Sequence, residues 1–310
     1  MTYDLSRFYT KNGIAAQKIA QQLLAIREGE RIPRIDDFVQ ELKLGRGTIQ
    51  GSLNLLEETK AIRLEPRGHL GTFLVMKNNK ILWQIAGNGS LVGVMPLPDS
   101  RKYEGLATGF AEVFKQSEIP FNMAYMRGAE NRIKALLQKR ADFAIVSRGA
   151  AESSCHRHPE LHILKTLGKG TFVNKHGILF SDKTKKRIEN GMKVGIDETS
   201  FDQKKLTLYE CEELDVQFIS VHYTQMFTLL NHGKIDAAVW NLDEIHLHPE
   251  LGVSDFQSEK ALQLVDVISE TAVLIHKENK HVKHVLEELP FSNIIEIQKL
   301  VEQGKKLPHY

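Results

Sequence analysis

From residue 91 onward, short apolar runs of strand length alternate with stretches whose apolar residues recur at helical spacing. This alternation constrains the fold more than any other feature, because it is typical of a parallel sheet whose faces are covered by helices. In the first set, strands are predicted at 91–97, 121–126 and 141–147, and helices at 103–114 and 131–139. The order strand, helix, strand, helix, strand predicts an α/β domain.

A second set with the same plan follows. Strands are predicted at 192–197, 216–221, 236–241, 262–267 and 271–276, and helices at 223–230, 282–289 and 294–301. A leucine-rich helix, a short basic turn and an Asp-led strand make up "NRIKALLQKRADFAIVS", and "MFTLLNHGKIDAAVW" repeats that unit. We therefore expect one domain over 81–310 with two similar lobes. Lobe I is expected at about 88–170 and 265–310, and lobe II at about 175–262.

The first 78 residues follow a different plan. Apolar spacing predicts helices at 13–27, 35–42 and 46–59, with Pro33 just before the second. Two extended segments at 61–65 and 72–76 are joined by "PRGHLG", which is typical of a hairpin turn. Residues 77–80, "KNNK", are expected to be a polar linker. Three helices followed by a two-stranded wing predict a winged helix-turn-helix domain at 1–78.

Three glycines in "LGRGTIQGSL" raise the question of a nucleotide-binding loop. The pattern is wrong for one, because the third glycine comes one residue late and the preceding segment is helical rather than extended. No Lys-Ser or Lys-Thr follows, so a P-loop is excluded as well. The second helix of a helix-turn-helix fits better, with Gly45 permitting a positive φ in the turn and Gly51 allowing a close approach.

The third predicted helix has an outward polar face. With Ile49, Leu53 and Leu56 turned inward, the residues expected to face outward are Arg46, Thr48, Gln50 and Asn54. Arginine pairs with guanine, glutamine and asparagine pair with adenine, and threonine bonds phosphate, so this face is suited to the DNA major groove. A merely solvated helix face is the alternative, and the wing behind the helix favours DNA.

These segments resemble the GntR-type transcriptional regulators. The resemblance rests on "IP" (32–33), "LGRGTIQGSLNLLEETKAIRLEP" (44–66) and "GHLGTFLV" (68–75). The chain keeps the family residues Arg46, Thr48, Gly71, Thr72 and Phe73, and it departs from the family pattern at Asp36, Gly45 and Gln50. The resemblance implies that Arg67 and His69 of the wing contact DNA, and we expect Thr72 to do so as well. We also expect a homodimer whose two-fold symmetry matches a pseudo-palindromic double-stranded operator.

The larger domain resembles the type 2 periplasmic-binding-protein fold, which is also the effector domain of LysR-type regulators. A GntR-like head on such a body is similar to the YhfZ-type group of regulators. In open α/β sheets, ligands bind beyond the carboxyl ends of the strands, and hydroxyls and arginines there favour anions. The residues expected to bind a small anionic metabolite in the interlobe cleft are Ser100, Arg101, Arg127, Ser147, Arg148, Thr199, Ser200 and Asn241. A helix cap or a surface charge is the alternative for each residue singly.

Composition limits the remaining function classes. Residues 1–80 hold 13 lysines and arginines against 9 acidic residues, while the rest of the chain holds 28 against 30, which fits a basic DNA-binding head. No apolar run reaches the length of a membrane span, and the start lacks the apolar core of a secretory signal. Cys155 and Cys211 are expected to be reduced thiols of a cytoplasmic protein. The histidines in "CHRH" (155–158) and "HLH" (246–248) match no zinc pattern, so no metal or cofactor is expected.

The sequence therefore predicts a ligand-responsive transcriptional regulator with no catalytic residues and no membrane partner. An enzyme of type 2 binding-protein fold is the alternative, although no nucleophile elbow or H-E-x-x-H motif occurs. A plain solute-binding module is a third possibility, against which the missing signal sequence argues.

Overall fold

The computed structural model describes residues 10–310, so residues 1–9 of the predicted head lie outside the described residues. The chain forms two compact units. The first comprises the residues up to Leu91 together with Phe114–Asn122 and Glu278–Leu289, and the second comprises Val92–Val113, Met123–Lys277 and Pro290–Tyr310. The domain boundary predicted between 78 and 81 stays a prediction.

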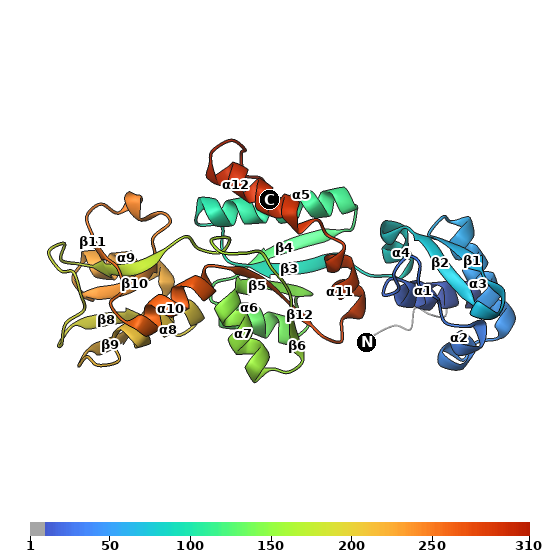
Figure 1. Cartoon of the computed structure of the whole chain (residues 1–310), viewed down its shortest axis with the longest axis horizontal. Coiled ribbons are helices and arrows are strands. Elements are labelled where there is room, and N and C mark those ends of the chain that lie inside the picture. The colour runs from blue at the N-terminus through green and yellow to red at the C-terminus, as the bar shows by residue number, and fades with distance from the viewer. Residues whose placement is uncertain (1–9) are drawn as a thin grey trace. The chain divides into compact units, whose positions relative to one another are not determined.

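The first unit contains the winged helix-turn-helix (Figure 1). Its elements are α1 (Lys11–Leu23), α2 (Ile35–Leu42), α3 (Arg46–Glu58), β1 (Ile62–Pro66), the short 3-10 helix η2 (Gly68–Leu70) and β2 (Thr72–Lys77). β1 and β2 pair antiparallel as the wing. Ile19, Ile49 and Leu56 are fully buried where α1 packs against α3. The order three helices, then hairpin, confirms the fold class predicted for the head.

The turn between α2 and α3 differs from the prediction in one respect. Lys43 carries the positive φ, 55°, whereas Gly45 is extended with φ −67° and caps α3. A glycine is therefore not required for the backbone of this turn. Gly51 instead marks a close approach, since a Cβ there would lie 3.2 Å from Nδ2 of Asn12 on α1. The expected close packing at Gly51 is confirmed, and the neighbour is α1.

The predicted polar linker at 77–80 is wrong in part. The side chain of Asn78 accepts a hydrogen bond from the amide of Ile81 and caps a helix, α4 (Asn79–Ile85). Leu82 and Trp83 of this helix are buried. The capping power of Asn78 explains the difference, because an asparagine before a helix satisfies an N–H that would otherwise lack a partner.

The second unit carries two five-stranded mixed sheets (Figure 1). The first has the order β4-β3-β5-β12-β6. Its strands are β3 (Leu91–Met95), β4 (Phe121–Tyr125), β5 (Phe143–Ser147), β6 (Leu161–Thr166) and β12 (Thr271–His276). The second has the order β11-β7-β10-β8-β9. Its strands are β7 (His176–Phe180), β8 (Lys193–Ile196), β9 (Gln217–Ser220), β10 (Ala237–Asn241) and β11 (Gly252–Ser254).

Each sheet combines parallel pairs with antiparallel strands. β3 pairs parallel with β5, and β8 pairs parallel with both β9 and β10. β12 is antiparallel to β5 and β6, and β7 is antiparallel to β10 and β11. The sequence predicted the parallel part of this arrangement but not the antiparallel strands, of which β6, β7 and β11 were not foreseen at all.

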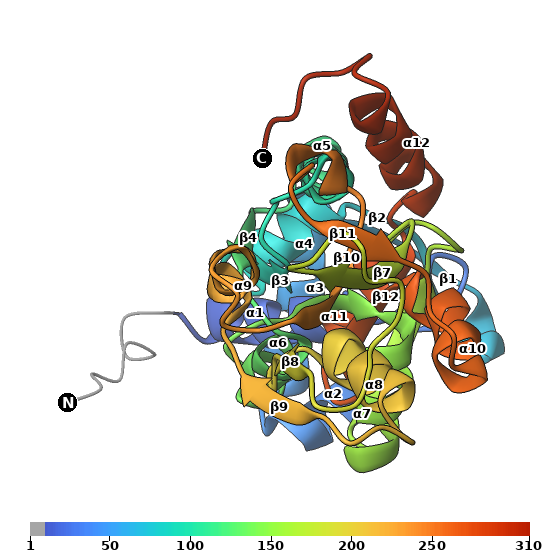
Figure 2. The same cartoon turned by 90° about the vertical axis from the view of Figure 1, so that its left-hand side faces the viewer.

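The helices of the second unit are α5 (Arg101–Ser117), α6 (Ala129–Leu137), α7 (Arg148–Arg157), α8 (Phe201–Glu210), α9 (Met226–Asn231), α10 (Glu259–Ile268) and α12 (Phe291–Glu302). The remaining helix, α11 (Lys280–Glu287), belongs to the first unit. Short 3-10 turns occur at Tyr223–Gln225 and Ile245–Leu247. The α8 and α10 helices pack against each other (Figure 2).

The strand predicted at 262–267 is wrong, because this segment lies within α10. The apolar residues of "LQLVDV" alternate only in part, because Leu264 and Val265 are adjacent, and Ala261 and Ile268 are buried at a spacing of seven, which is two helical turns. Ser258 starts the helix by accepting a hydrogen bond from the amide of Ala261. The helix cap and the helical spacing of the buried residues therefore explain why this segment is not a strand.

The α5 and α12 helices lie side by side because two glycines of α5 leave room for the backbone of α12 (Figure 1). A Cβ at Gly105 would lie 2.8 Å from the carbonyl oxygen of Gln298, and one at Gly109 would lie 2.9 Å from that of Ile294. Gly109→Ala is expected to lower the free energy of unfolding by about 1–3 kcal/mol through overpacking. Urea denaturation of the full chain measures this. Gly89→Ala, which meets no atom within 4 Å, is the control, and equal losses in both would contradict the packing argument.

Candidate functional site

The outward face of α3 presents the residues that the sequence assigned to DNA. Arg46, Gln50 and Asn54 are exposed, and Thr48 is half-buried. Nη1 of Arg46 lies 2.5 Å from Oδ1 of Asp36 on α2, and both side chains are about two-thirds exposed, at 65% and 66%. An ion pair this exposed contributes about 0–1 kcal/mol, so a phosphate or a base can displace Asp36 from Arg46 at little cost.

The wing carries the other three predicted residues. Arg67 and His69 are exposed at its tip, and Thr72 is half-buried at the start of β2. Nε of Arg67 donates to Glu65 over 2.8 Å, and its guanidinium lies 4.4 Å from the ring centroid of Phe73. These contacts hold Arg67 at the tip of the wing while leaving it 43% exposed.

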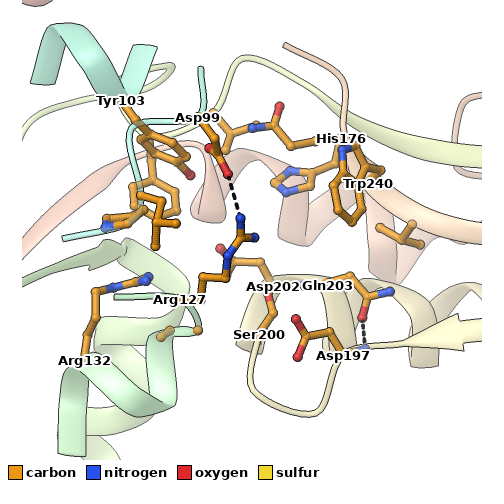
Figure 3. Close-up of a pocket in the computed structure, with 18 residues that line it drawn as sticks. Asp99, Tyr103, Arg127, Arg132, His176, Asp197, Ser200, Asp202, Gln203 and Trp240 are labelled. Carbon is orange, nitrogen blue, oxygen red and sulfur yellow. Dashed lines mark hydrogen bonds and ion pairs between the residues drawn. The ribbon is translucent and has the colours of Figure 1, made fainter. Parts of the chain in front are cut away.

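A pocket of about 100 Å³ lies in the second unit, between the carboxyl ends of β3 and β4 of one sheet and those of β8 and β10 of the other (Figure 3). The residues that line it are Pro96, Leu97, Asp99, Tyr103, Arg127, Gly128, Ala129, Arg132, Phe172, Val173, His176, Asp197, Ser200, Asp202, Gln203, Val239, Trp240 and Asn241. Strand ends are the usual ligand position in open α/β sheets.

Arg132 is the most unusual of these residues. It lies on α6 and is only 4% exposed. Nη1 donates to the carbonyl of Met126 over 2.7 Å, but Nε is buried without a hydrogen-bond partner, and the side chain makes no ion pair with any described residue. Burial lowers the pKa of the guanidinium to about 10, so it still carries its charge at neutral pH. A buried unpaired charge costs several kcal/mol, which points to an anionic group as the missing partner.

Asp202, on α8, is a second buried charge-bearing side chain. It is 9% exposed, and Oδ1 accepts a hydrogen bond of 2.6 Å from the hydroxyl of Ser147. Burial raises the pKa of Asp202 to about 7, while the bond from Ser147 and the charge of Arg132 act in the opposite direction. This carboxyl is therefore poised between its two protonation states near neutral pH.

Five further polar side chains of the lining have contacts or pKa values that bear on the pocket (Figure 3). Oδ1 of Asp197 accepts bonds from the amide and the hydroxyl of Thr199, and Gln203 accepts from the amide of Asp197. Nη2 of Arg127 faces Oδ2 of Asp99 at 3.9 Å. Burial also lowers the pKa of His176 to about 4, which keeps this imidazole neutral at physiological pH.

The eight residues that the sequence assigned to the ligand fall into three groups. Three of them, Arg127, Ser200 and Asn241, line the pocket, and Ser100 lines a neighbouring cavity of about 320 Å³. Ser147 and Thr199 bond to Asp202 and Asp197, behind the lining. Arg101 and Arg148 line neither cavity, because Arg101 pairs with Glu104 and Arg148 pairs with Glu270.

Sequence reasoning missed Arg132, Asp202 and Gln203 because it considered only the loops at the strand ends, and these residues lie in the first turn of the helices that follow. A usable signal was present. Arg132 follows Ala129 by three positions and precedes Leu136 by four, so it lies on the apolar face of its helix. A charged residue on an apolar helix face is rare unless it has a partner or a ligand.

Within residues 10–310, no group of three or more His, Cys, Asp or Glu side chains is positioned to hold a metal ion. This covers the histidine clusters at 155–158 and 246–248. None of the helices described there is both long enough and apolar enough to span a membrane.

A helix-turn-helix domain and a binding-protein-like α/β domain in one chain suggest the class of transcriptional regulators. Residues 78–310 match the model of the YhfZ C-terminal domain, and residues 27–74 match a helix-turn-helix domain. The chain belongs to the YhfZ family.

Two relatives support this assignment. The YhfZ protein of Escherichia coli strain K12 is 36% identical over 235 residues, which cover 76% of each chain. The crystal structure of YhfZ from Shigella flexneri is 31% identical, with a TM-score of 0.61 over 75% of this chain and 98% of that one. The periplasmic aliphatic sulphonate binding protein SsuA of Escherichia coli is 13% identical, with a TM-score of 0.53 over 70% of this chain and 74% of that one. This last likeness shows that the larger domain has a periplasmic-binding-protein-like fold, as the sequence predicted.

Proposed function

We propose that this chain is a ligand-responsive transcriptional regulator of the GntR type. The observation that carries the proposal is the combination, in one chain, of a polar exposed face on α3 with a pocket that contains the buried, unpaired Arg132. The exposed polar face of α3 is suited to reading DNA, and a buried arginine without an ion-pair partner among the described residues is suited to binding a ligand. Regulation of DNA binding by a small molecule uses both, and such a protein acts in the cytoplasm.

On the DNA side, the head of residues 1–78 inserts α3 into the major groove. Arg46, Gln50 and Asn54 read base edges, and Thr48 and Thr72 bond phosphates. Arg67 and His69 of the wing meet the backbone or the minor groove. Two copies of the chain bind as a homodimer, so that the operator carries two half-sites related by the same two-fold symmetry.

On the ligand side, residues 81–310 bind a small metabolite between the lobes. Arg127, Ser200 and Asn241 contact the ligand together with Arg132, and Ser100 extends the site into the neighbouring cavity. Ser147 and Thr199 act indirectly by holding Asp202 and Asp197. Arg101 and Arg148 do not contact the ligand directly and act at the edge of the pocket. Closure of the lobes on the ligand then alters the geometry of the paired heads.

Arg46→Ala is the direct test of the DNA-binding proposal. Loss of a bidentate base contact is expected to weaken operator binding by about 10- to 100-fold. A mobility-shift titration with the protein's own upstream region, at two salt concentrations, measures the affinity and its salt dependence.

The matched control for this test is Arg140→Ala, which removes an exposed arginine of the second unit and should leave the affinity unchanged. Binding that is insensitive to salt, or equal in wild type and Arg46→Ala, would refute the assignment of α3 as the recognition helix.

One observation favours the alternative function, an enzyme of the same fold. The pKa of Asp202, about 7, is in the range of a general base. Incubation of the purified chain with a pooled metabolite extract, followed by NMR, distinguishes the two functions. A regulator leaves every metabolite intact, whereas consumption that disappears in Asp202→Asn would identify catalysis.

A further inference from the structure

The charges that line the pocket do not match a simple anion. The lining contains two arginines, Arg127 and Arg132, and three carboxyl residues, Asp99, Asp197 and Asp202. With every group ionised, the formal charge of the lining is negative. A ligand with only negative groups would satisfy Arg132 but would be repelled by the carboxylates around it.

The geometry of Arg132 favours a planar anion as its ligand. Its Nε is buried without a partner, and among the described residues its side chain makes one hydrogen bond, from Nη1 to the carbonyl of Met126. Because the guanidinium is a rigid fork, the Nε edge can form two parallel bonds to the two oxygens of a carboxylate. No carboxylate of the described residues forms an ion pair with it.

Asp197 and Asp202 favour a positively charged group on the ligand. Each is at least nine-tenths buried, and each uses one carboxylate oxygen to accept bonds from its own lobe or from Ser147. The second oxygen of each makes no hydrogen bond to a described residue. An ammonium group has three donors and no acceptor, so a single ammonium can serve both free oxygens.

We propose that the ligand is a small zwitterion of the α-amino-acid class, with its carboxylate bound by Arg132 and its ammonium bound by Asp197 and Asp202. This proposal rests on the proposed ligand-sensing function of the same pocket. The pocket of about 100 Å³ takes the zwitterionic head. The neighbouring cavity of about 320 Å³ shares Asp99, Arg127, Trp240 and Asn241 with it and takes the side chain.

The arrangement also accounts for the state of Asp202 without ligand. Burial favours its protonated form, and an ammonium beside it would favour the ionised form. The groups that face Asp202 are Arg132 of α6 and Ser147 at the start of α7. Neither changes its charge near neutral pH, so Asp202 is the group expected to release a proton when a zwitterion binds.

The test uses the full chain and three probe panels in isothermal titration: the common L-amino acids, their analogues without the amino group, and their analogues without the carboxyl group. At least one amino acid is expected to bind, and each of its two analogues is expected to bind about 100-fold more weakly, the factor for loss of one buried charge-assisted contact.

Three variants assign the two charges. Arg132→Gln and Asp202→Asn should each weaken amino-acid binding by about 100-fold, while Asp266→Asn, an exposed carboxylate on α10, should have no effect. Asp202→Asn should also abolish the proton release, which is measured by titration in buffers of different ionisation enthalpy. If Arg132→Gln does not fold, Arg132→Lys and Asp202→Asn decide the question.

One contrary outcome is that carboxylates bind as tightly as amino acids do, and equally well to wild type and to Asp202→Asn. This result would overturn the proposal of a zwitterionic ligand, but it would leave the proposed ligand-sensing function intact. If no probe of any panel binds, the zwitterion is overturned, and the mobility-shift assay with Arg46→Ala decides separately whether the chain is a DNA-binding regulator.

Discussion

Replacing Asp202 by asparagine is expected to stabilise the protein above pH 7 and to leave its stability unchanged near pH 4. The pKa of this carboxyl is raised from 3.8 to about 7 by burial, so the folded state holds a proton that the unfolded state has released. Stability therefore falls as pH rises from about 4 to about 7 and stays low above that window. About 3 pKa units correspond to on the order of 4 kcal/mol.

Thermal denaturation of wild type and Asp202→Asn between pH 4 and pH 8 measures this effect. The difference between the two melting temperatures should grow across the window and then level off. The asparagine oxygen can still accept the hydrogen bond from Ser147, so packing is preserved. The variant lacks only the charge.

Wild type has to be compared with Asp202→Asn because His176 also makes the stability depend on pH. Its pKa is lowered by burial from 6.5 to about 4, so stability that depends on it rises with pH between about 4 and 6.5 and is lost as pH falls. In wild type this trend opposes that of Asp202. The difference between wild type and Asp202→Asn cancels the His176 contribution, and a difference that does not vary with pH would contradict a buried ionisable Asp202.

The head was predictable because its signals are local. Apolar positions at helical spacing, Pro33, and a turn with Gly68 and Gly71 define three helices and a hairpin without reference to distant residues. Both wing glycines do adopt a positive φ, 57° and 96°. The turn before α3 was less predictable, because Lys43 took the left-handed conformation that the sequence assigned to Gly45.

The antiparallel strands were missed for a different reason. β7 and β11 each join a sheet next to strands that are distant in sequence, and β11 is only three residues long. Periodicity cannot reveal such an element, because its stability comes from its neighbours rather than from its own pattern. The same holds for the pocket, where Ser147 and Asp202 meet although 55 positions separate them.

The polar ends of strands therefore located the pocket only in part. Arg127, Ser200 and Asn241 line the pocket, as expected of strand-end residues. Whether Arg132 lines it depends on which face α6 turns toward the pocket. The inferred charge of the ligand therefore differs from the one that the sequence predicted. Hydroxyls and arginines at strand ends indicated an anion, whereas the buried carboxyls of Asp197 and Asp202 require a positive group as well.

Gly128→Ala is expected to prevent the lobes from approaching each other and so to weaken ligand binding. Gly128 follows β4 of one sheet and has a φ of 75°, and a Cβ there would lie 2.7 Å from the backbone carbonyl oxygen of Thr199, which follows β8 of the other sheet. The amide of Glu130 donates to the same carbonyl over 3.4 Å. Since a backbone atom blocks the new methyl group, the lobes must separate, and the side chains of Arg132 and Asp202 then reach for the ligand from opposite walls.

We expect at least tenfold weaker binding of the tightest amino acid from the titration panel, with operator binding in the absence of ligand unchanged. Isothermal titration and the mobility-shift assay measure the two quantities. The matched control is Gly168→Ala, because Gly168 also has a positive φ, 94°, but no atom lies within 4 Å of its would-be Cβ. Both variants place an alanine at a positive φ, and only Gly128→Ala meets the opposite lobe. Wild-type ligand affinity in Gly128→Ala would show that the site works without close approach at Thr199, and closure of the lobes would then be the wrong account of how this protein senses its ligand.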